Sequence, residues 1–209
     1  INATVQGWKG GAGTVEAYTY TLAGGKVKVA STDLSSAGVF SMTLPGKDTL
    51  QPVMNTLIEL FGPGQDTTCA ALPVSSDAAL KVATIDRFTV LRGGAQVSTL
   101  LTSPPATAST TLPFNLDAYV YFYADRSSTV TGTQDCTYAP GSGSTSHSTS
   151  TFNMKLKAGW NVVHITGKLD GSATAYTNTA DFSTTDKTDF SWYATATGGP
   201  SPASLPLYR

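Results

Sequence analysis

The sequence contains few charged residues, and it has no long apolar run. Charged side chains make up only 13% of the 209 residues, and the formal net charge is −1. Proteins that bind nucleic acids present a strongly basic face, so this balance argues against a nucleic-acid partner. A membrane-spanning helix needs about 18 or more consecutive apolar residues, and no such run occurs.

Recognisable catalytic motifs are also missing. The sequence has no Gly-x-Ser-x-Gly elbow, no metalloprotease helix motif and no phosphate-binding loop. These absences favour a non-catalytic role, although a Ser-His-Asp arrangement assembled from distant residues stays open at this stage.

Cysteine is limited to Cys69 and Cys136. An even pair in a chain rich in Ser and Thr predicts one disulfide, formed in an oxidising compartment. A bridge across such a long loop would stabilise the fold by about 4 kcal/mol on the chain-entropy model. The alternative is two unpaired thiols, one of them buried as a small apolar side chain.

The first residue is Ile1, and no signal peptide is visible. We therefore expect the chain to start after a removed or disordered leader, and a lipid anchor could precede residue 1. Together with the predicted disulfide, this favours an extracellular or cell-envelope location.

Residues 150–170 carry the strongest structural pattern. Phe152, Met154 and Leu156 alternate with polar residues, which indicates a half-buried β-strand. A turn at residues 157–159 then leads into a second strand rich in β-branched residues, so the stretch predicts a β-hairpin.

Similar patterns along the chain predict an all-β protein. We expect two β-sandwich-like halves, residues 1–101 and 114–209, separated by a proline-rich linker or crossover at 102–113. The length also fits one large β domain. Residues 137–150 are rich in Gly and Ser, which predicts a loop.

One segment breaks the β pattern. Its apolar residues at helical spacing are Leu50, Val53, Met54, Leu57, Ile58 and Phe61. Their spacing predicts one short amphipathic helix over about 48–61, plugging the open end of the first sandwich.

Two stretches resemble known families. The run AGVFS at 37–41, within residues 3–45, resembles the transthyretin-like or carboxypeptidase-regulatory-like sandwich of bacterial surface proteins. The run LKAGWNVV at 156–163, within 114–170, resembles the LKxGWNxV hairpin of uncharacterised secreted proteins and lipoproteins of bacterial envelopes. These resemblances imply a structural or adhesive module in an envelope or surface layer, and they imply no reaction.

The candidate binding surface is a row of tyrosines. Tyr119, Tyr121 and Tyr123 alternate with Val120 and Phe122, so they share the opposite face of a predicted strand. An exposed aromatic row would suit sugars, lipids or a protein partner. The alternative is that the row lies between the two sheets.

The candidate metal ligands are few. His147 and His164 are the only histidines, and imidazoles are common copper ligands. Their presence leaves open a copper-dependent superoxide dismutase-like enzyme, although the His-x-His pair of that family is missing. Asp181, Asp186 and Asp189 could hold Ca²⁺ or could be solvated turn residues.

From the sequence we therefore expect a non-catalytic protein of the cell envelope or surface layer, without a cofactor, that binds a larger envelope assembly. The dismutase-like enzyme with copper is the alternative.

Overall fold

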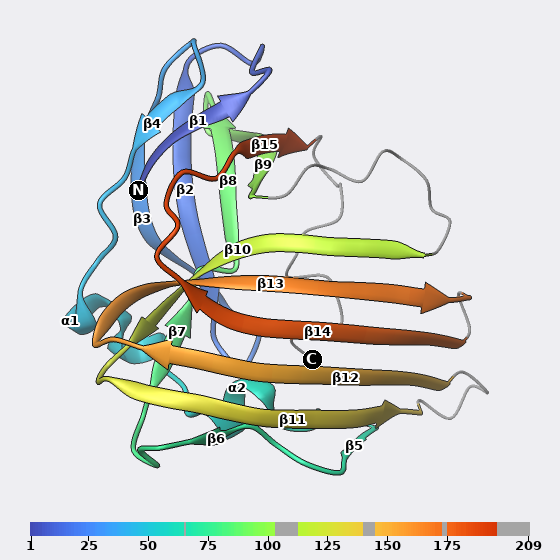
Figure 1. Ribbon diagram of the computed structural model, residues 1–209. Helices are drawn as coiled ribbons and strands as arrows, with labels where there is room; N and C mark the ends of the chain where they lie inside the picture. Colours follow the sequence, from blue (N-terminus) through green and yellow to red (C-terminus); the bar gives the residue numbers. More distant parts are fainter. Residues whose placement is uncertain (65, 103–112, 140–144, 173–174, 196–209) are drawn as a thin grey trace.

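The computed structural model describes every residue except 65, 103–112, 140–144, 173–174 and 196–209. Two curled β-sheets form the molecule, and short helical segments lie beside them (Figure 1). Most strands of the first sheet stand upright or oblique in this view, whereas the long strands of the second sheet run across it. The predicted all-β fold with two sheet-based halves is thereby confirmed.

The first sheet has seven strands and nearly closes on itself. Their order is β3 (Lys26–Leu34), β2 (Gly13–Tyr20), β8 (Arg87–Arg92), β9 (Ala95–Leu101), β15 (Trp192–Thr195), β1 (Asn2–Gln6) and β4 (Val39–Ser41). Only β1 and β15 pair in parallel. The two edge strands meet where the Thr32 Oγ1 hydroxyl donates to the Ser41 carbonyl oxygen at 2.6 Å.

The second sheet has eight strands and forms an open trough. Its path is β5 (Thr67–Cys69), β11 (Ser128–Tyr138), β12 (Thr145–Leu156), β14 (Ala175–Thr185), β13 (Gly159–Gly171), β10 (Phe114–Ala124) and β7 (Val82–Thr84). The eighth strand, β6 (Val74–Ser75), pairs with β11. Here β12 and β14 are the parallel pair.

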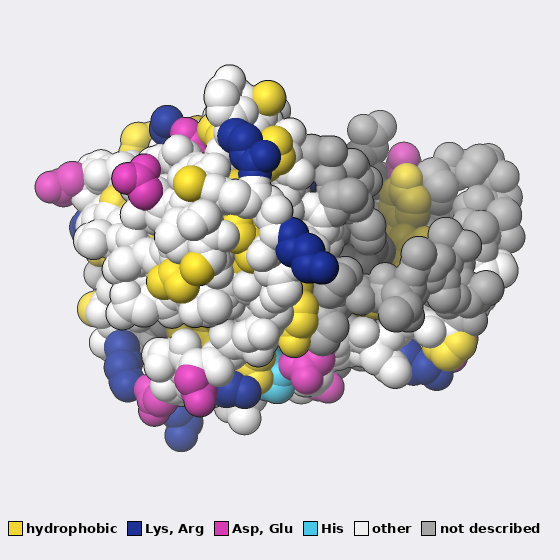
Figure 2. All heavy atoms as spheres, turned by 90° about the horizontal axis from the view of Figure 1, so that it is seen from above, with side chains coloured by type: hydrophobic (Ala, Val, Ile, Leu, Met, Phe, Trp, Pro, Cys, Tyr) yellow, Lys and Arg dark blue, Asp and Glu magenta, His cyan; other side chains and the backbone are white. Residues whose placement is uncertain are grey.

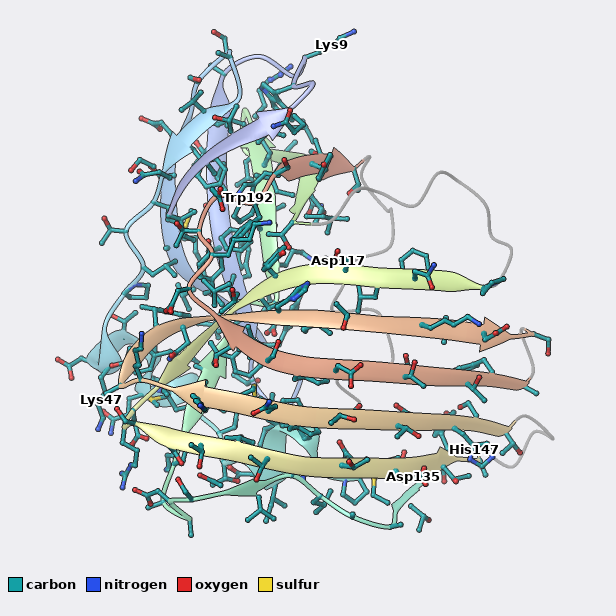
Figure 3. All side chains as sticks on the ribbon, in the orientation of Figure 1. Lys9, Lys47, Asp117, Asp135, His147 and Trp192 are labelled. Carbon is teal, nitrogen blue, oxygen red and sulfur yellow. A yellow bond between two sulfur atoms is a disulfide. The ribbon has the colours of Figure 1, made fainter. Side chains whose placement is uncertain are left out.

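The two sheets exchange strands across the middle of the chain. β5, β6 and β7 come from the first half of the sequence, yet they belong to the second sheet. β15 comes from the end of the described chain, yet it lies between β9 and β1 of the first sheet. Trp192 anchors it there with 1% of its side chain exposed, inside the first sheet (Figure 3). Most of the predicted linker at 102–113 lies outside the described residues.

The predicted hairpin at 150–170 is wrong in its pairing. Both strands exist, as β12 and β13, but β14 lies between them and pairs with each. The two strands therefore leave the tight turn at residues 157–158 and diverge. Local alternation identified the strands, but their pairing is set by a strand that comes later in the chain.

The turn between β12 and β13 is held by a side chain instead of a strand ladder. Asn161 Oδ1 accepts from the Lys157 backbone N–H at 2.8 Å, and Asn161 Nδ2 donates to the Lys157 and Gly159 carbonyl oxygens at 2.8 and 3.0 Å. Gly159 has a φ of 98°, a conformation that favours glycine. Beside it, Trp160 Nε1 donates to the Pro45 carbonyl oxygen at 2.8 Å, which ties the turn to the segment after β4.

Two apolar cores lie on opposite faces of β10. Tyr121 belongs to the core enclosed by the first sheet, whereas Phe122 belongs to the core in the trough of the second. β10 thus serves as a wall of both cores, because successive residues of a strand point to opposite faces.

The predicted continuous helix at 48–61 is instead broken. The segment forms α1 (Lys47–Leu50), the 3₁₀ helix η1 (Gln51–Val53) and α2 (Leu57–Phe61). Met54 between them is extended, and Asn55 forms a β-bridge with Val82. The break lets the segment serve both cores. Leu50 and Val53 enter the first core, and Leu57 and Phe61 enter the second.

Charged side chains are scattered over the surface. The face seen in Figure 2 is mostly neither charged nor apolar, with acidic, basic and small apolar patches scattered over it. This agrees with the low charge content and with exposed strand positions occupied by Ser and Thr.

Candidate functional site

The tyrosine row lies between the two sheets. Tyr121 is only 9% exposed and packs against Phe88, with ring centroids 6.0 Å apart, and against Trp192. Burial raises the pKa of the Tyr121 hydroxyl well above its usual value. Tyr119 stacks on Phe190, with ring centroids 4.6 Å apart.

Tyr123, the last member of the row, packs edge to face against Trp160, with ring centroids 5.4 Å apart. Tyr121 thus occupies the space between the sheets, and Tyr119 and Tyr123 are partly buried against the same core. The use of the row as a binding surface stays a prediction.

The two histidines lie far apart. His147 on β12 pairs in register with Thr177 of β14, and His164 on β13 pairs in register with Ser183 of β14. Six residues along a strand correspond to about 20 Å. Figure 3 shows His147 near the tip of the second sheet, well away from Asp117. His164 Nε2 lies 2.8 Å from Asp117 Oδ1, so its nearest polar partner is a carboxylate.

The structure brings no metal-binding group together from the described residues. No cluster of three or more His, Cys, Asp or Glu side chains in that part of the chain could hold a metal ion. Asp181 lies within β14, where it is exposed, and Asp186 pairs with Lys157 at 3.2 Å. The acidic candidates therefore do not converge.

The predicted disulfide is confirmed. Cys69 and Cys136 lie directly opposite each other on β5 and β11, and their sulfurs are bonded. The bridge joins the two halves of the sequence, but both cysteines belong to the second sheet. It therefore fastens the short edge strand β5 to that sheet, and it does not link the two sheets.

The most distinctive surface feature is a cleft of about 710 Å³ where the two sheets meet, which we call the seam cleft. One wall is the end of β2 and the turn after it, residues 19–22. The other wall is the broken segment and its continuation, with residues 53–64. Thr67, Ala83, Thr84 and Asp86, together with Tyr138 of β11, complete the described lining.

Asp86 organises the polar side of the seam cleft. Its Oδ2 accepts from the Tyr20 backbone N–H at 2.9 Å and from Thr19 Oγ1 at 3.2 Å. Its Oδ1 accepts from Thr84 Oγ1 at 2.6 Å. These bonds hold the carboxylate in place at the junction between the end of β2 and the loop after β7.

The seam cleft also carries an unusual share of exposed apolar surface. The described chain leaves six large hydrophobic side chains exposed, namely Leu22, Val39, Ile58, Val74, Val97 and Tyr138. Three of these six, Leu22, Ile58 and Tyr138, line this one cleft. Ile58 is the most exposed of the three at 65%. Exposed apolar side chains that gather in this way are typical of an interaction site.

The charge in the seam cleft has a single sign. Glu59 and Asp86 are the charged residues in its described lining, and neither Lys nor Arg is among them. The Thr56 backbone N–H donates to Glu59 at 2.7 Å, and this bond lowers the pKa of the Glu59 carboxyl. The Glu59 carboxyl is therefore expected to be ionised at neutral pH.

A second, smaller pocket of about 250 Å³ lies in the trough of the second sheet. It borders the seam cleft, because Leu60, Gly62, Gly64, Thr67 and Tyr138 line both. The disulfide forms part of its wall. We call it the trough pocket.

Comparisons with known proteins identify no relative. No protein-family model, no curated protein and no solved structure matches this chain. No helix in the described part of the chain has the length and hydrophobicity that a membrane span requires.

Proposed function

We propose that this protein is a non-catalytic component of a cell envelope that attaches to a larger envelope assembly through the seam cleft. The partner would insert a protein segment that carries an apolar side chain next to Lys or Arg. The observation that carries the proposal is that three of the six exposed large hydrophobic side chains gather in one acidic cleft.

The apolar part of the proposal rests on Leu22, Ile58 and Tyr138. Each of them exposes apolar surface that an inserted side chain could remove from water, which favours binding by roughly 25 cal/mol per Å². The three come from the turn after β2, from α2 and from the end of β11. A ligand seated among them would therefore touch both sheets.

The acidic part of the proposal rests on Glu59 and Asp86. Glu59 forms no salt bridge with a described Lys or Arg, and Asp86 accepts hydrogen bonds from Thr19, Tyr20 and Thr84. A cationic side chain entering the cleft would meet two carboxylates and no like charge from the described lining. Such complementarity mainly directs orientation and the rate of association.

The envelope location is supported by the disulfide, the low charge content and the sequence resemblances. A copper-dependent enzyme gains no support from the geometry, since His147 and His164 point to no common site.

A peptide-display selection on the folded protein tests the proposal. Binders should be enriched in aromatic or aliphatic residues next to Lys or Arg. They should lose affinity at least tenfold for the double variant Leu22→Ser/Ile58→Ser. The matched control is Val74→Ser/Val97→Ser, which removes two exposed apolar side chains outside the cleft and should leave binding unchanged.

Glu59→Gln separates the charge from the apolar contact. Glutamine can keep the capping box at the start of α2, so the helix should persist while the charge is lost. Binding should become weaker and less sensitive to salt. Acidic binders, or binders that retain full affinity for Leu22→Ser/Ile58→Ser, would exclude the seam cleft as the attachment site.

A further inference from the structure

The trough pocket is built from matched rows across three strands. On the inner face of β11, β12 and β14, neighbouring residues in register form the rows Tyr138–Ser146–Tyr176, Cys136–Ser148–Asn178 and Gln134–Ser150–Ala180. The next row, Gly132–Phe152–Phe182, already belongs to the apolar core. Along β12, the inward-facing residue therefore changes from Phe152 to Ser150, its next neighbour on the same face.

Two of the serines present unpaired hydroxyls to the pocket. Ser146 is 5% exposed and Ser150 is 6% exposed, and both line the trough pocket. Among the residues that the structure describes, neither hydroxyl has a hydrogen-bond partner. Ser148 between them accepts from Asn178 Nδ2 at 3.3 Å. Neither the Ser146 nor the Ser150 hydroxyl oxygen is among the fully buried unpaired polar atoms of the described chain, so both hydroxyls are accessible from the pocket. Unpaired hydroxyls that border a pocket are free to hydrogen-bond a ligand that can donate and accept.

The lining restricts the charge of that ligand. Its described residues include hydroxyl, amide, aromatic and aliphatic side chains, but no Asp, Glu, Lys, Arg or His. A charged ligand would lose its hydration without gaining an ion pair. The ligand is therefore neutral.

The size and the mixed lining restrict the ligand further. A volume of about 250 Å³ is the space of about eight water molecules in the liquid, so it holds one small ring and not a drug-sized molecule. Leu60 and the rings of Tyr138 and Tyr176 offer apolar surface opposite or beside the serines. A sugar ring has this same combination, with hydroxyls around its edge and C–H groups on its faces.

We propose that the trough pocket binds one ring of a neutral carbohydrate, held by the unpaired hydroxyls of Ser146 and Ser150 and by the neighbouring tyrosine rings. This inference rests on the serine rows and not on the seam cleft, so either proposal can fail without the other.

Titration of the ¹⁵N-labelled full chain with methyl glucoside, N-acetylglucosamine and glucuronate tests the inference by NMR. At least one of the two neutral sugars should give saturable shifts that concentrate in β11, β12 and β14. Glucuronate should bind at least tenfold more weakly, since no cation in the described lining meets its carboxylate.

The variant Ser146→Ala/Ser150→Ala removes the two hydroxyls without adding bulk. It should stay folded, because those hydroxyls have no described partner to lose, and it should bind the neutral sugar at least tenfold more weakly. Thr151→Ala, at an exposed position of β12, is the matched control and should bind like the parent. The single variants Ser146→Ala and Ser150→Ala serve if the double variant is unstable.

Three outcomes would overturn the inference. They are no saturable binding of either neutral sugar, unchanged affinity in the serine variants, and binding of glucuronate as tight as that of the neutral sugars. Sugar binding should also survive Leu22→Ser/Ile58→Ser, which distinguishes the two sites.

Discussion

Adjacent positions in α2 provide a sharp test of how the broken segment packs. Leu57 is 6% exposed and lies in the second core, whereas its neighbour Ile58 is 65% exposed. Both belong to the first turn of the same helix, where an introduced Asp has a similarly favourable interaction with the helix dipole. Leu57→Asp and Ile58→Asp therefore differ mainly in burial.

The expected difference between the two variants is large. Truncating a buried Leu costs about 2–5 kcal/mol through lost burial and the cavity left behind. Burying the new polar group without a partner adds about 1–3 kcal/mol. The sum of about 3–8 kcal/mol approaches the whole stability of a typical domain, about 5–15 kcal/mol. Ile58→Asp, at a surface position, should change the free energy of unfolding by only about 0.5 kcal/mol.

Thermal melting and hydrogen exchange measure the outcome. At about 2–4 °C per kcal/mol for a chain of this size, Leu57→Asp should lower the Tm by about 6–30 °C, or prevent folding. Its amide protection should fall first in β11, β12 and β14, which share the second core with Leu57. Equal melting of the two variants would show that α2 does not pack into the trough, and the assignment of Leu57 to the second core would be wrong.

Three further predictions follow from single side chains. Asn161→Ala removes all three side-chain hydrogen bonds at the turn after β12. Each bond contributes about 0.5–1.5 kcal/mol and these are partly exposed, so the free energy of unfolding measured in urea should fall by about 1–3 kcal/mol. An unchanged urea midpoint would show that the turn does not depend on these bonds. Tyr121→Ser should destabilise the fold strongly, since the ring is buried between the sheets, and a parent-like Tm would support the surface hypothesis. The hydrogen bond from Tyr18 lowers the pKa of Glu16, so the stabilisation by Glu16 relative to Glu16→Gln should be complete above its unfolded-state pKa of 4.5 and disappear as the pH falls through its lower folded-state pKa. Urea unfolding of parent and variant from pH 7 to pH 2 checks this, and a difference that persists at the lowest pH would contradict it.

Strands with strong polar–apolar contrast could be predicted from the sequence. Phe152, Met154 and Leu156 alternate with polar residues, and each is buried in β12 as expected. The serines at 146, 148 and 150 occupy the same face of the same strand. They differ too little in polarity from their neighbours to show a period, so the sequence pattern predicts a loop in this region.

The sequence contains residues that mark the break in the predicted helix, although the hydrophobic spacing continues across it. Thr56 and Glu59 form a capping box, a pattern that marks the start of a helix. Pro52, which cannot donate a backbone hydrogen bond, lies in the first turn of η1. The apolar spacing at 50–61 continues across the break because residues before the break are buried in the first core and residues after it in the second. Hydrophobic spacing alone does not distinguish a helix buried in one core from two short helices buried in two cores.

Neither the strand pairing nor the two pockets could be predicted from the sequence pattern, because both depend on contacts between distant residues. β14 lies between two strands that are separated by a two-residue turn, and only its contacts with both of them specify this arrangement. The seam cleft likewise joins residues 19–22, 53–64, 83–86 and 138, which no local period connects. The apolar spacing places Ile58 on the buried stripe of a continuous helix, and Ile58 is exposed because the helix is broken.

The broken segment explains why the two candidate sites lie next to each other. Leu50 and Val53 are fixed in the first core, and Leu57 and Phe61 are fixed in the second, so residues 54–56 must cross from one sheet to the other. That crossing leaves the exposed side of α2 facing the end of β2, which creates the seam cleft. The continuation of α2 at Gly62 and Gly64 then borders the trough pocket. A perturbation that shifts α2 should therefore affect both sites, whereas changes at Ser146 and Ser150 should affect only the trough.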